Sequence, residues 1–400
     1  MAIDRKRRAI IHHATHTKAV LLFASTMTVM SGAIISPALP GIGRFYADAP
    51  QVLIQLILTL PALMITLFSP LMGYLADRFG RKPLLILMLS IYGLAGASGF
   101  LIDSVNLLLA SRALMGVAVA GILSISTTLV GDYFSGAERV RFLGLQSSSM
   151  ALGGVIFINL GGLLSDWSWR GPFLLYLTGV LLLPYALMVL REPHRTTSDS
   201  AASQAPAVRL DLWRTGLAYL IAMISMMMFY MFPAQLPFLL TSQGIDSGLA
   251  IGAALSMAAL SASLVSFYYG RVKMFFSVMT IYVLGFFIAA LGLFITGAAQ
   301  GYAMAVVGAA VAGLGLGLFM PNTTTWLMRI APERARARVF GGFTSAFFFG
   351  QFISPIVVSW VLQGLESLRD VYIAMGLLCL SLALIVAVLG RTLLKADASL

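Results

Sequence analysis

The chain has 400 residues, of which 59% are hydrophobic and only 10% are charged, and its formal net charge is +11. A soluble protein carries about 25% charged residues, so this composition excludes a soluble globular protein. The single cysteine, Cys379, excludes a disulfide framework and a cysteine-rich metal site, and no cofactor or metal is expected.

Twelve apolar runs follow one another along the chain. Each is about 20 residues or longer, which is the length that a helix needs to cross the hydrocarbon core of a bilayer. Strands of a membrane barrel would instead show about ten residues of alternating polarity. The sequence therefore predicts an all-α integral membrane protein. Its twelve predicted transmembrane helices cover residues 18–43, 51–76, 83–102, 105–131, 140–164, 171–190, 212–240, 247–269, 273–296, 301–328, 336–363 and 369–391.

The basic residues predict the orientation of these helices. Twenty-two of the 26 Lys and Arg residues belong to segments on the N-terminal side of the membrane, the exceptions being Arg44, Arg112, Arg170 and Arg369. Basic segments stay in the cytoplasm, so both termini are expected there, in a multi-pass protein of the cell inner membrane. This one-sided distribution accounts for the positive charge without nucleic acid. The expected partners are the lipid bilayer and a small-molecule substrate, and the protein is expected to be a monomer.

A polar segment, residues 191–211, divides the twelve helices into two sets of six. It is rich in Ser, Thr, Ala and Pro, a composition that is typical of a flexible linker. We therefore predict five parts. They are an N-terminal cytoplasmic tail at 1–17, a six-helix bundle at 18–190, the cytoplasmic linker at 191–211, a second six-helix bundle at 212–391 and a C-terminal cytoplasmic tail at 392–400.

The two halves repeat one another at an offset of 197 residues, with no gap. At this offset Gly116 falls on Gly313 and Gly153 on Gly350. Parallel repeats of this kind, related by an axis along the membrane normal, occur in transporters whose substrate site lies between the halves near the midplane. The repeat therefore predicts two pseudo-symmetric bundles with a substrate site between them.

A short charged loop, residues 73–85, joins the second and third predicted helices. Gly80 permits a tight turn and Gly73 permits close helix contact. Asp77 can bind the exposed N–H groups of a helix start, and Arg78 and Arg81 can bind carboxylates or lipid phosphates. The pattern Gly-x-x-x-Asp-Arg-x-Gly-Arg-Lys resembles the signature loop of the major facilitator superfamily of transporters.

Other segments extend this resemblance over nearly the whole chain. Residues 32–40, 109–118 and 350–355 resemble elements of the twelve-span drug:proton antiporters of that superfamily. The resemblance implies export by alternating access, coupled to protons. It also implies a conformational latch, closed in the outward-open state, in which Asp77 and Arg81 bind the start of the eleventh helix and Asp132 at the end of the fourth. The predicted latch residues are Gly73, Asp77, Arg78, Gly80, Arg81 and Asp132.

The sequence departs from the antiporter branch in two places. Every Asp and Glu lies in a loop or at the end of a predicted helix, although a membrane-embedded carboxylate is the usual carrier of a coupled proton. In the fifth helix, Phe157 and Ile158 replace a Gly-Pro pair of the family element. Two alternatives therefore stay open, an uptake permease or facilitator for a polar solute and a non-transporting membrane receptor. No constellation of Ser, His and Asp, of metal ligands or of phosphate-binding glycines indicates an enzyme.

Arg112 is the only charged residue that lies away from the ends of the predicted helices, about 10 Å from the outer end of its own helix. Such a residue usually faces a cavity or a partner. It is either a contact for an anionic or polar substrate group, a part of proton transfer as the family implies, or a structural link to carbonyls of adjacent helices. Amides in lipid are costly unless they are paired, and a Met- and Phe-rich stretch surrounds Tyr230. The predicted substrate-binding residues are Arg112, Gln146, Asn159, Tyr230, Gln235, Asn322 and Gln351.

The charges inside the helices also predict the substrate. With one buried cation and no buried anion, the helices can accept a neutral or anionic group more readily than a cationic one. Methionine and aromatic side chains offer an adaptable apolar surface beside them. We therefore predict a small amphiphilic substrate that is neutral or anionic.

Overall fold

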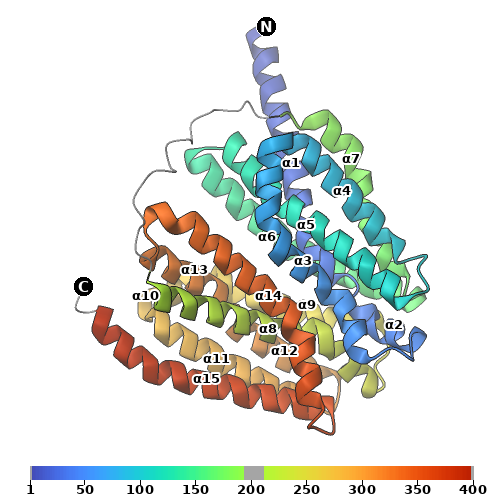
Figure 1. The fold of residues 1–400 in the computed structure, drawn as a ribbon, viewed down its shortest axis with the longest axis vertical. Helices are drawn as coiled ribbons and strands as arrows, with labels where there is room; N and C mark the ends of the chain where they lie inside the picture. The colour runs from blue at the N-terminus through green and yellow to red at the C-terminus, as the bar shows by residue number, and fades with distance from the viewer. Residues whose placement is uncertain (1, 193–210, 398–400) are drawn as a thin grey trace. The chain divides into compact units, whose positions relative to one another are not determined.

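The computed structural model describes residues 2–192 and 211–397, with side chains given for these except 2–15, 140, 334, 337 and 389–397. Within these ranges every regular element is helical, which confirms the all-α prediction (Figure 1). The α-helices are α1 (Ala2–Ala33), α2 (Leu39–Phe45), α3 (Gln51–Phe79), α4 (Arg81–Ser98), α5 (Val105–Tyr133), α6 (Gly136–Trp167), α7 (Thr178–Val189), α8 (Leu212–Ser242), α9 (Gly248–Phe267), α10 (Tyr269–Phe275), α11 (Val278–Gly297), α12 (Tyr302–Leu316), α13 (Phe319–Ile330), α14 (Arg336–Leu362) and α15 (Leu368–Asp397). Short 3₁₀ helices are η1 (Ser36–Ala38), η2 (Gly171–Leu177) and η4 (Glu333–Ala335).

Eleven helical segments of the described residues are long and apolar enough to cross a membrane, and each falls on one of the twelve predicted spans. The third predicted span, 83–102, falls on α4, which is helical but is not among the eleven. Its first turn carries Arg81 and Lys82, so the apolar part of this 18-residue helix is short. The chain is therefore a multi-pass membrane protein, and the count of twelve requires α4 to cross as well.

Proline and glycine interrupt two of the spans. The first span changes from α1 through η1 to α2, where Pro37 and Pro40 supply no backbone N–H for a continuous helix. The tenth span divides into α12 and α13 after Gly317, whose carbonyl accepts a hydrogen bond from the Ser266 hydroxyl at 2.6 Å. A Cβ at Gly317 would lie 2.3 Å from the Ala262 carbonyl oxygen, so only glycine allows α9 to pack this closely.

The chain forms two compact units. Unit 1 comprises Met1–Ile34, Leu60–Phe157 and Arg170–Ala207, and unit 2 comprises Ile35–Thr59, Ile158–Trp169 and Val208–Leu400. Both units therefore draw on the first half of the sequence, and the predicted division at residues 18–190 and 212–391 stays a prediction. Most of the predicted linker lies outside the described residues. The predicted N-terminal tail is helical from Ala2 and continuous with α1.

Pairs of glycine contacts reproduce the sequence repeat. In unit 1, a Cβ at Gly116 would lie 2.6 Å from Pro61 Cα, and one at Gly153 would lie 2.1 Å from the Thr26 side chain. In unit 2, a Cβ at Gly313 would lie 2.3 Å from the Ala258 carbonyl oxygen, and one at Gly350 would lie 2.1 Å from the Met223 carbonyl oxygen. The contacted positions, 61 and 258 and likewise 26 and 223, are also related by the offset of 197 residues. The same close helix crossings thus occur twice.

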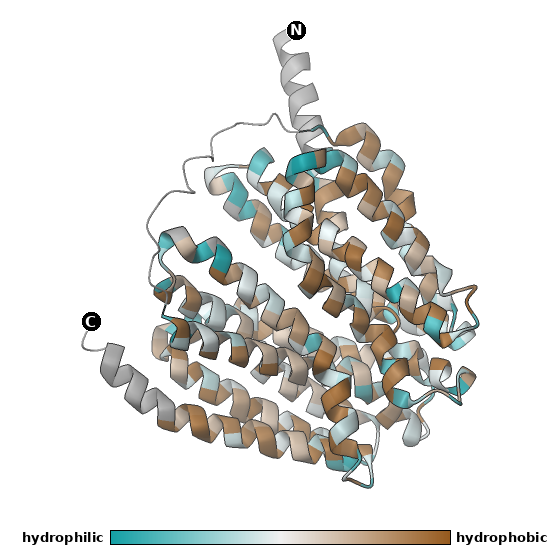
Figure 2. Ribbon diagram, in the orientation of Figure 1, coloured by the Kyte–Doolittle hydropathy of each residue, from teal (hydrophilic) through white to brown (hydrophobic). Residues whose placement is uncertain are grey.

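The described helices consist of apolar residues along most of their length (Figure 2). Large side chains such as Leu94, Leu181 and Trp360 are 64%, 75% and 75% exposed. A soluble monomer would not expose this much apolar surface, but lipid tails solvate it. The exposed apolar residues therefore mark the lipid-facing surface.

Candidate functional site

Two buried glutamines bond to one another in unit 2. Gln55 of α3 donates from Nε2 to Gln235 Oε1 of α8 at 2.8 Å, and the two residues are only 2% and 1% exposed. Beside them, the Ser36 hydroxyl donates to the Pro233 carbonyl at 2.5 Å. An unpaired amide in an apolar medium costs several kcal/mol, so this hydrogen bond lowers the cost of placing both amides inside the helices.

A third helix, α14, joins this polar region. Thr59 of α3 donates to the Phe352 carbonyl at 3.4 Å, next to Gln351, which is 4% exposed. Ser354 of α14 donates to the Met227 carbonyl of α8 at 2.8 Å. The helices α3, α8 and α14 thus each carry buried, uncharged polar side chains in this region, and of these Gln55 and Gln235 bond directly to one another. We call Gln55, Thr59, Gln235 and Gln351 the amide cluster.

Arg112 has a different environment, in unit 1. Its side chain is 0% exposed, and Nη2 donates to the carbonyls of Ala95 at 2.9 Å and Gly96 at 2.6 Å. These carbonyls belong to the last turn of α4, where helix carbonyls lack intrahelical partners and the dipole favours a cation. The guanidinium also lies 5.0 Å from the ring centroids of both Phe173 and Tyr176. These contacts match the structural alternative for Arg112, whereas a substrate contact by Arg112 stays a prediction.

The other predicted binding residues are divided between the two units. Gln146 of α6 donates to the Ser25 hydroxyl at 2.5 Å in unit 1. Asn159, also of α6 but in unit 2, donates to the Ser256 hydroxyl of α9 at 2.7 Å. Tyr230 is half-buried on α8, one turn before Gln235. Neither the amide cluster nor either unit therefore contains all seven predicted residues.

Asn322 is fully buried at a junction of three helices. Its Oδ1 accepts from the Tyr269 hydroxyl of α10 at 3.1 Å, and its Nδ2 donates to the Val278 carbonyl of α11 at 2.9 Å. Both ends of the amide are thus used to hold α10 and α11 against α13. This arrangement is that of a structural link, and the substrate contact predicted for Asn322 stays a prediction.

The charged loop forms part of the predicted latch within unit 1. Arg81 pairs with Asp132 at the end of α5 and lies 3.8 Å from Asp77. Arg78 is exposed, with its guanidinium 5.4 Å from the Phe79 ring centroid. Gly80 has φ +94°, a conformation that favours glycine. Within unit 1, a Cβ at Gly73 would meet no atom inside 4 Å, so close packing there does not explain this glycine.

Glu192 completes this loop and was missed from the sequence. Its two carboxylate oxygens accept from the backbone N–H groups of Arg81 and Lys82, each at 2.7 Å, and so cap the start of α4. Glu192 is the second residue of the predicted linker, where an acidic residue gives no signal of its own. Gln55 was missed because it lies close to the polar end of an otherwise apolar run.

Among the described residues, no three His, Cys, Asp or Glu side chains are grouped so that they could hold a metal ion. The buried polar side chains described above are hydroxyls and amides, apart from the guanidinium of Arg112. Such groups orient and bind a solute by hydrogen bonding, but they do not provide a nucleophile with a base.

The fold and sites thus define a multi-pass, all-α membrane carrier with a repeated architecture. The sequence model of the Major Facilitator Superfamily matches residues 21–276 and 218–398, and the chain belongs to this family of transporters. Carriers of this family move solutes and are not enzymes.

Two curated relatives are themselves described as exporters or resistance proteins. The bacillibactin exporter of Bacillus subtilis (strain 168) is 32% identical over 165 residues, which cover 39% of this chain and 41% of that protein. The class C tetracycline resistance protein of Escherichia coli is 29% identical over 232 residues, covering 54% of this chain and 56% of that protein. The chain thus spans about two fifths and just over half of the length of these relatives.

A solved structure supports the fold over almost the whole chain. The bacterial homologue of the human lysosomal transporter Spinster, in an inward-facing and occupied conformation, has a TM-score of 0.76 at 19% identity. The match covers 96% of this chain and 98% of that one. At this identity the likeness establishes the fold alone.

Proposed function

We propose that the chain is a secondary active transporter that exports a small amphiphilic compound across the bacterial inner membrane by alternating access. The observation that carries this proposal is the amide cluster, in which a bonded pair of buried glutamines and two further buried, uncharged polar side chains lie within apolar helices of unit 2. The efflux names of the relatives favour export over uptake. We further propose that both termini are cytoplasmic and that the carrier works as a monomer.

The amide cluster favours a neutral substrate that can both donate and accept hydrogen bonds. Each glutamine carries a carbonyl acceptor and an NH₂ donor, so a substrate amide or hydroxyl can replace the bond between Gln55 and Gln235 with two bonds of its own. The anionic substrate expected from the sequence depended on Arg112. Because that guanidinium binds the last carbonyls of α4, the proposal does not use it.

Proton coupling is part of the proposal and rests on the family resemblance. The opposite direction, uptake of a polar solute, is favoured by one observation, the replacement of the Gly-Pro pair by Phe157 and Ile158 in α6. The two directions predict opposite responses to the same pH gradient. They can therefore be separated in one assay.

The test uses purified protein in proteoliposomes of uniform orientation, with a panel of neutral, anionic and cationic amphiphilic probes of similar size. In these vesicles the lumen corresponds to the cell exterior. An exporter that exchanges substrate for protons accumulates the neutral probe in the lumen when the lumen is acidic. Accumulation under the reverse gradient indicates uptake, and no gradient-dependent movement of any probe would contradict transport.

The role of the amide cluster is tested in the same vesicles. Gln235→Leu leaves Gln55 without its partner, so we expect transport of the neutral probe to fall about tenfold or more, as for the loss of one or two buried hydrogen bonds. Gln51→Leu is the matched control, because Gln51 lies one turn earlier on α3 and is exposed. Equal transport by the two variants would contradict a substrate contact by the cluster.

A further inference from the structure

The predicted outer ends of several helices are joined by polar contacts in unit 2. Asp166, in the last turn of α6, accepts at Oδ1 from the backbone N–H of Gly248 at 2.5 Å and at Oδ2 from that of Leu249 at 3.2 Å. The Ser247 hydroxyl donates to Oδ2 at 3.3 Å. These N–H groups begin α9 and have no intrahelical acceptors, so the carboxylate of one helix caps the start of another.

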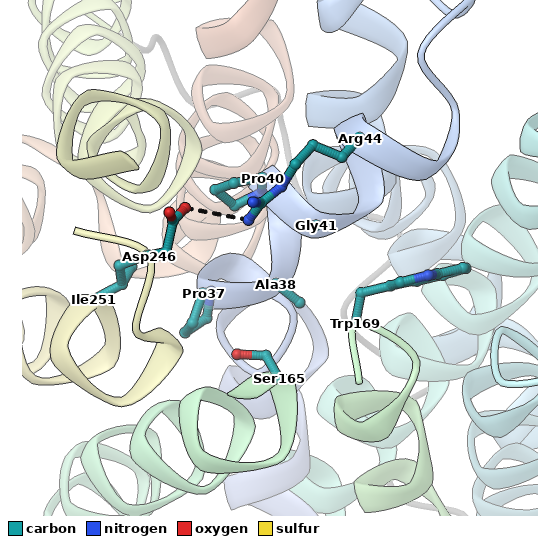
Figure 3. A pocket seen from close by; sticks show the side chains of 9 residues that line it. All are labelled: Pro37, Ala38, Pro40, Gly41, Arg44, Ser165, Trp169, Asp246 and Ile251. Carbon is teal, nitrogen blue, oxygen red and sulfur yellow. Dashed lines mark hydrogen bonds and ion pairs between the residues drawn. The ribbon is translucent and has the colours of Figure 1, made fainter. Parts of the chain in front are cut away.

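A second contact lies beside the first. Arg44 in the last turn of α2 pairs with Asp246 in the loop before α9, with 3.2 Å between Nη2 and Oδ1. Figure 3 shows these two side chains pointing toward one another across a small pocket. The volume of this pocket is about 40 Å³, which is room for water but not for a drug-sized substrate.

Close backbone packing surrounds these polar contacts. A Cβ at Gly162 of α6 would lie 2.3 Å from the Gly248 carbonyl oxygen, and a Cβ at Gly41 of α2 would lie 3.0 Å from Trp169 Cβ. Each contact of Arg44 or Asp166 joins an element from the first half of the sequence to one from the second half. Under the alternating access proposed above, separation of the two sequence halves on the outer side would break these contacts.

We propose that Asp166, Arg44 and Asp246 form an outer latch, which holds the outer side closed in the inward-open state and whose release opens the path to the outside. The proposal rests on the alternating access proposed above and names the residues that gate it. The sequence repeat does not reproduce this latch, because the position 197 residues after Asp166 is Gln363. The latch is therefore specific to the junction of α6 and α9.

The physical basis is the same as that proposed for the cytoplasmic loop. A carboxylate at a helix N-terminus gains from the partial positive charge of the unpaired N–H groups, and this gain disappears when the helices part. Asparagine at position 166 keeps one acceptor and removes the charge. Asp166→Asn therefore weakens closure without altering the shape of the α6 side.

The test measures how readily water reaches the latch in full-length protein in oriented proteoliposomes. The single native cysteine is removed by Cys379→Ser. Ile251 lines the cavity and is only 1% exposed, and its replacement Ile251→Cys supplies the reporter thiol. The rate of labelling by a membrane-impermeant maleimide reports outer opening. We expect Asp166→Asn to raise this rate about five- to tenfold and Arg44→Asp to raise it about threefold.

Two controls make the result decisive. Asp103→Asn removes an outer ion pair with Arg170 that joins two segments of the first half, so its labelling rate should equal that of the parent. The double variant Arg44→Asp with Asp246→Arg reverses both charges of this ion pair and so restores it, and we expect it to restore the slow labelling rate. This test stands even if Asp166→Asn fails to fold.

Two outcomes overturn the latch, and both are read in variants that keep the parent melting temperature. In the first, the parent, Asp166→Asn and Asp103→Asn are labelled at equal rates. In the second, the double variant Arg44→Asp with Asp246→Arg is labelled as fast as Arg44→Asp alone. Labelling requires neither substrate nor gradient. Latch-dependent labelling without transport of any probe would therefore support the latch and contradict the proposed export.

Discussion

Replacement of Arg112 by methionine separates a structural role from a substrate contact. The Gly96 carbonyl loses its charged donor, which costs about 1–3 kcal/mol, and the loss of two ring contacts adds about 1–2 kcal/mol. The Ala95 carbonyl keeps the Ser98 hydroxyl as a donor at 2.8 Å. Removal of a buried charge offsets part of this cost, so we expect the free energy of unfolding to fall by about 3 kcal/mol.

The assay is thermal unfolding in detergent, with transport of neutral and anionic probes measured on the same preparation. At about 2.1 cal/mol/K per residue, a loss of 3 kcal/mol lowers the midpoint by roughly 4 °C for a chain of this length. Both probes should be affected by the same factor. Arg112→Lys keeps the charge but not the planar guanidinium. Its thermal midpoint should lie between those of the parent and of Arg112→Met. An unchanged midpoint together with a selective loss of anion transport would refute the structural role.

Three other substitutions test individual contacts. Gly80→Ala places a Cβ at φ +94° and 3.1 Å from Glu192 Oε1, so it should lower the free energy of unfolding by about 1–2 kcal/mol, measured by thermal unfolding. Gly73→Ala is the control and should be nearly neutral. Equal effects of the two substitutions would contradict this account. Glu192→Gln removes the charge that caps α4. Hydrogen exchange at the first-turn amides of that helix should therefore accelerate about threefold or more. An unchanged exchange rate would contradict the capping role. Asn322→Leu leaves the Tyr269 hydroxyl and a backbone carbonyl unpaired, so the midpoint should fall by a few degrees; a stable variant that fails only in transport would instead indicate substrate binding.

The sequence predicted the helical architecture because each span carries its own signal, an apolar run of membrane length. The α4 helix is the informative exception, since its charged first turn belongs to the helix, whereas the sequence placed it in the loop. The repeat was also readable, because Gly116 and Gly313 meet the same constraint at matching crossings. Membrane-spanning helices and close helix crossings that admit only glycine can therefore be predicted from the residue types at these positions.

The bonding partners of polar residues were much less predictable. Arg112 and Asn322 stood out as polar residues in apolar runs, but the sequence did not reveal that carbonyls and ring faces engage them. Asp166 and Glu192 looked like ordinary loop acids, because the helix starts that they cap lie 82 and 110 residues or more away in sequence. Long-range pairing is set by helix packing, which the composition of one segment does not encode.

The described carboxylates with known contacts lie at helix ends or in loops, and this limits how firmly a latch can hold. An exposed ion pair contributes about 0–1 kcal/mol and a helix cap about 0.5–2 kcal/mol, so the outer latch supplies about 1–3 kcal/mol. Because 1.4 kcal/mol is a factor of ten, the latch biases two states by roughly five- to 150-fold. A buried ion pair of 3–5 kcal/mol would hold one state too firmly for rapid exchange. We therefore expect folded Asp166→Asn to retain a measurable transport rate with altered accessibility, and complete loss of transport would show that Asp166 does more than close the outer side.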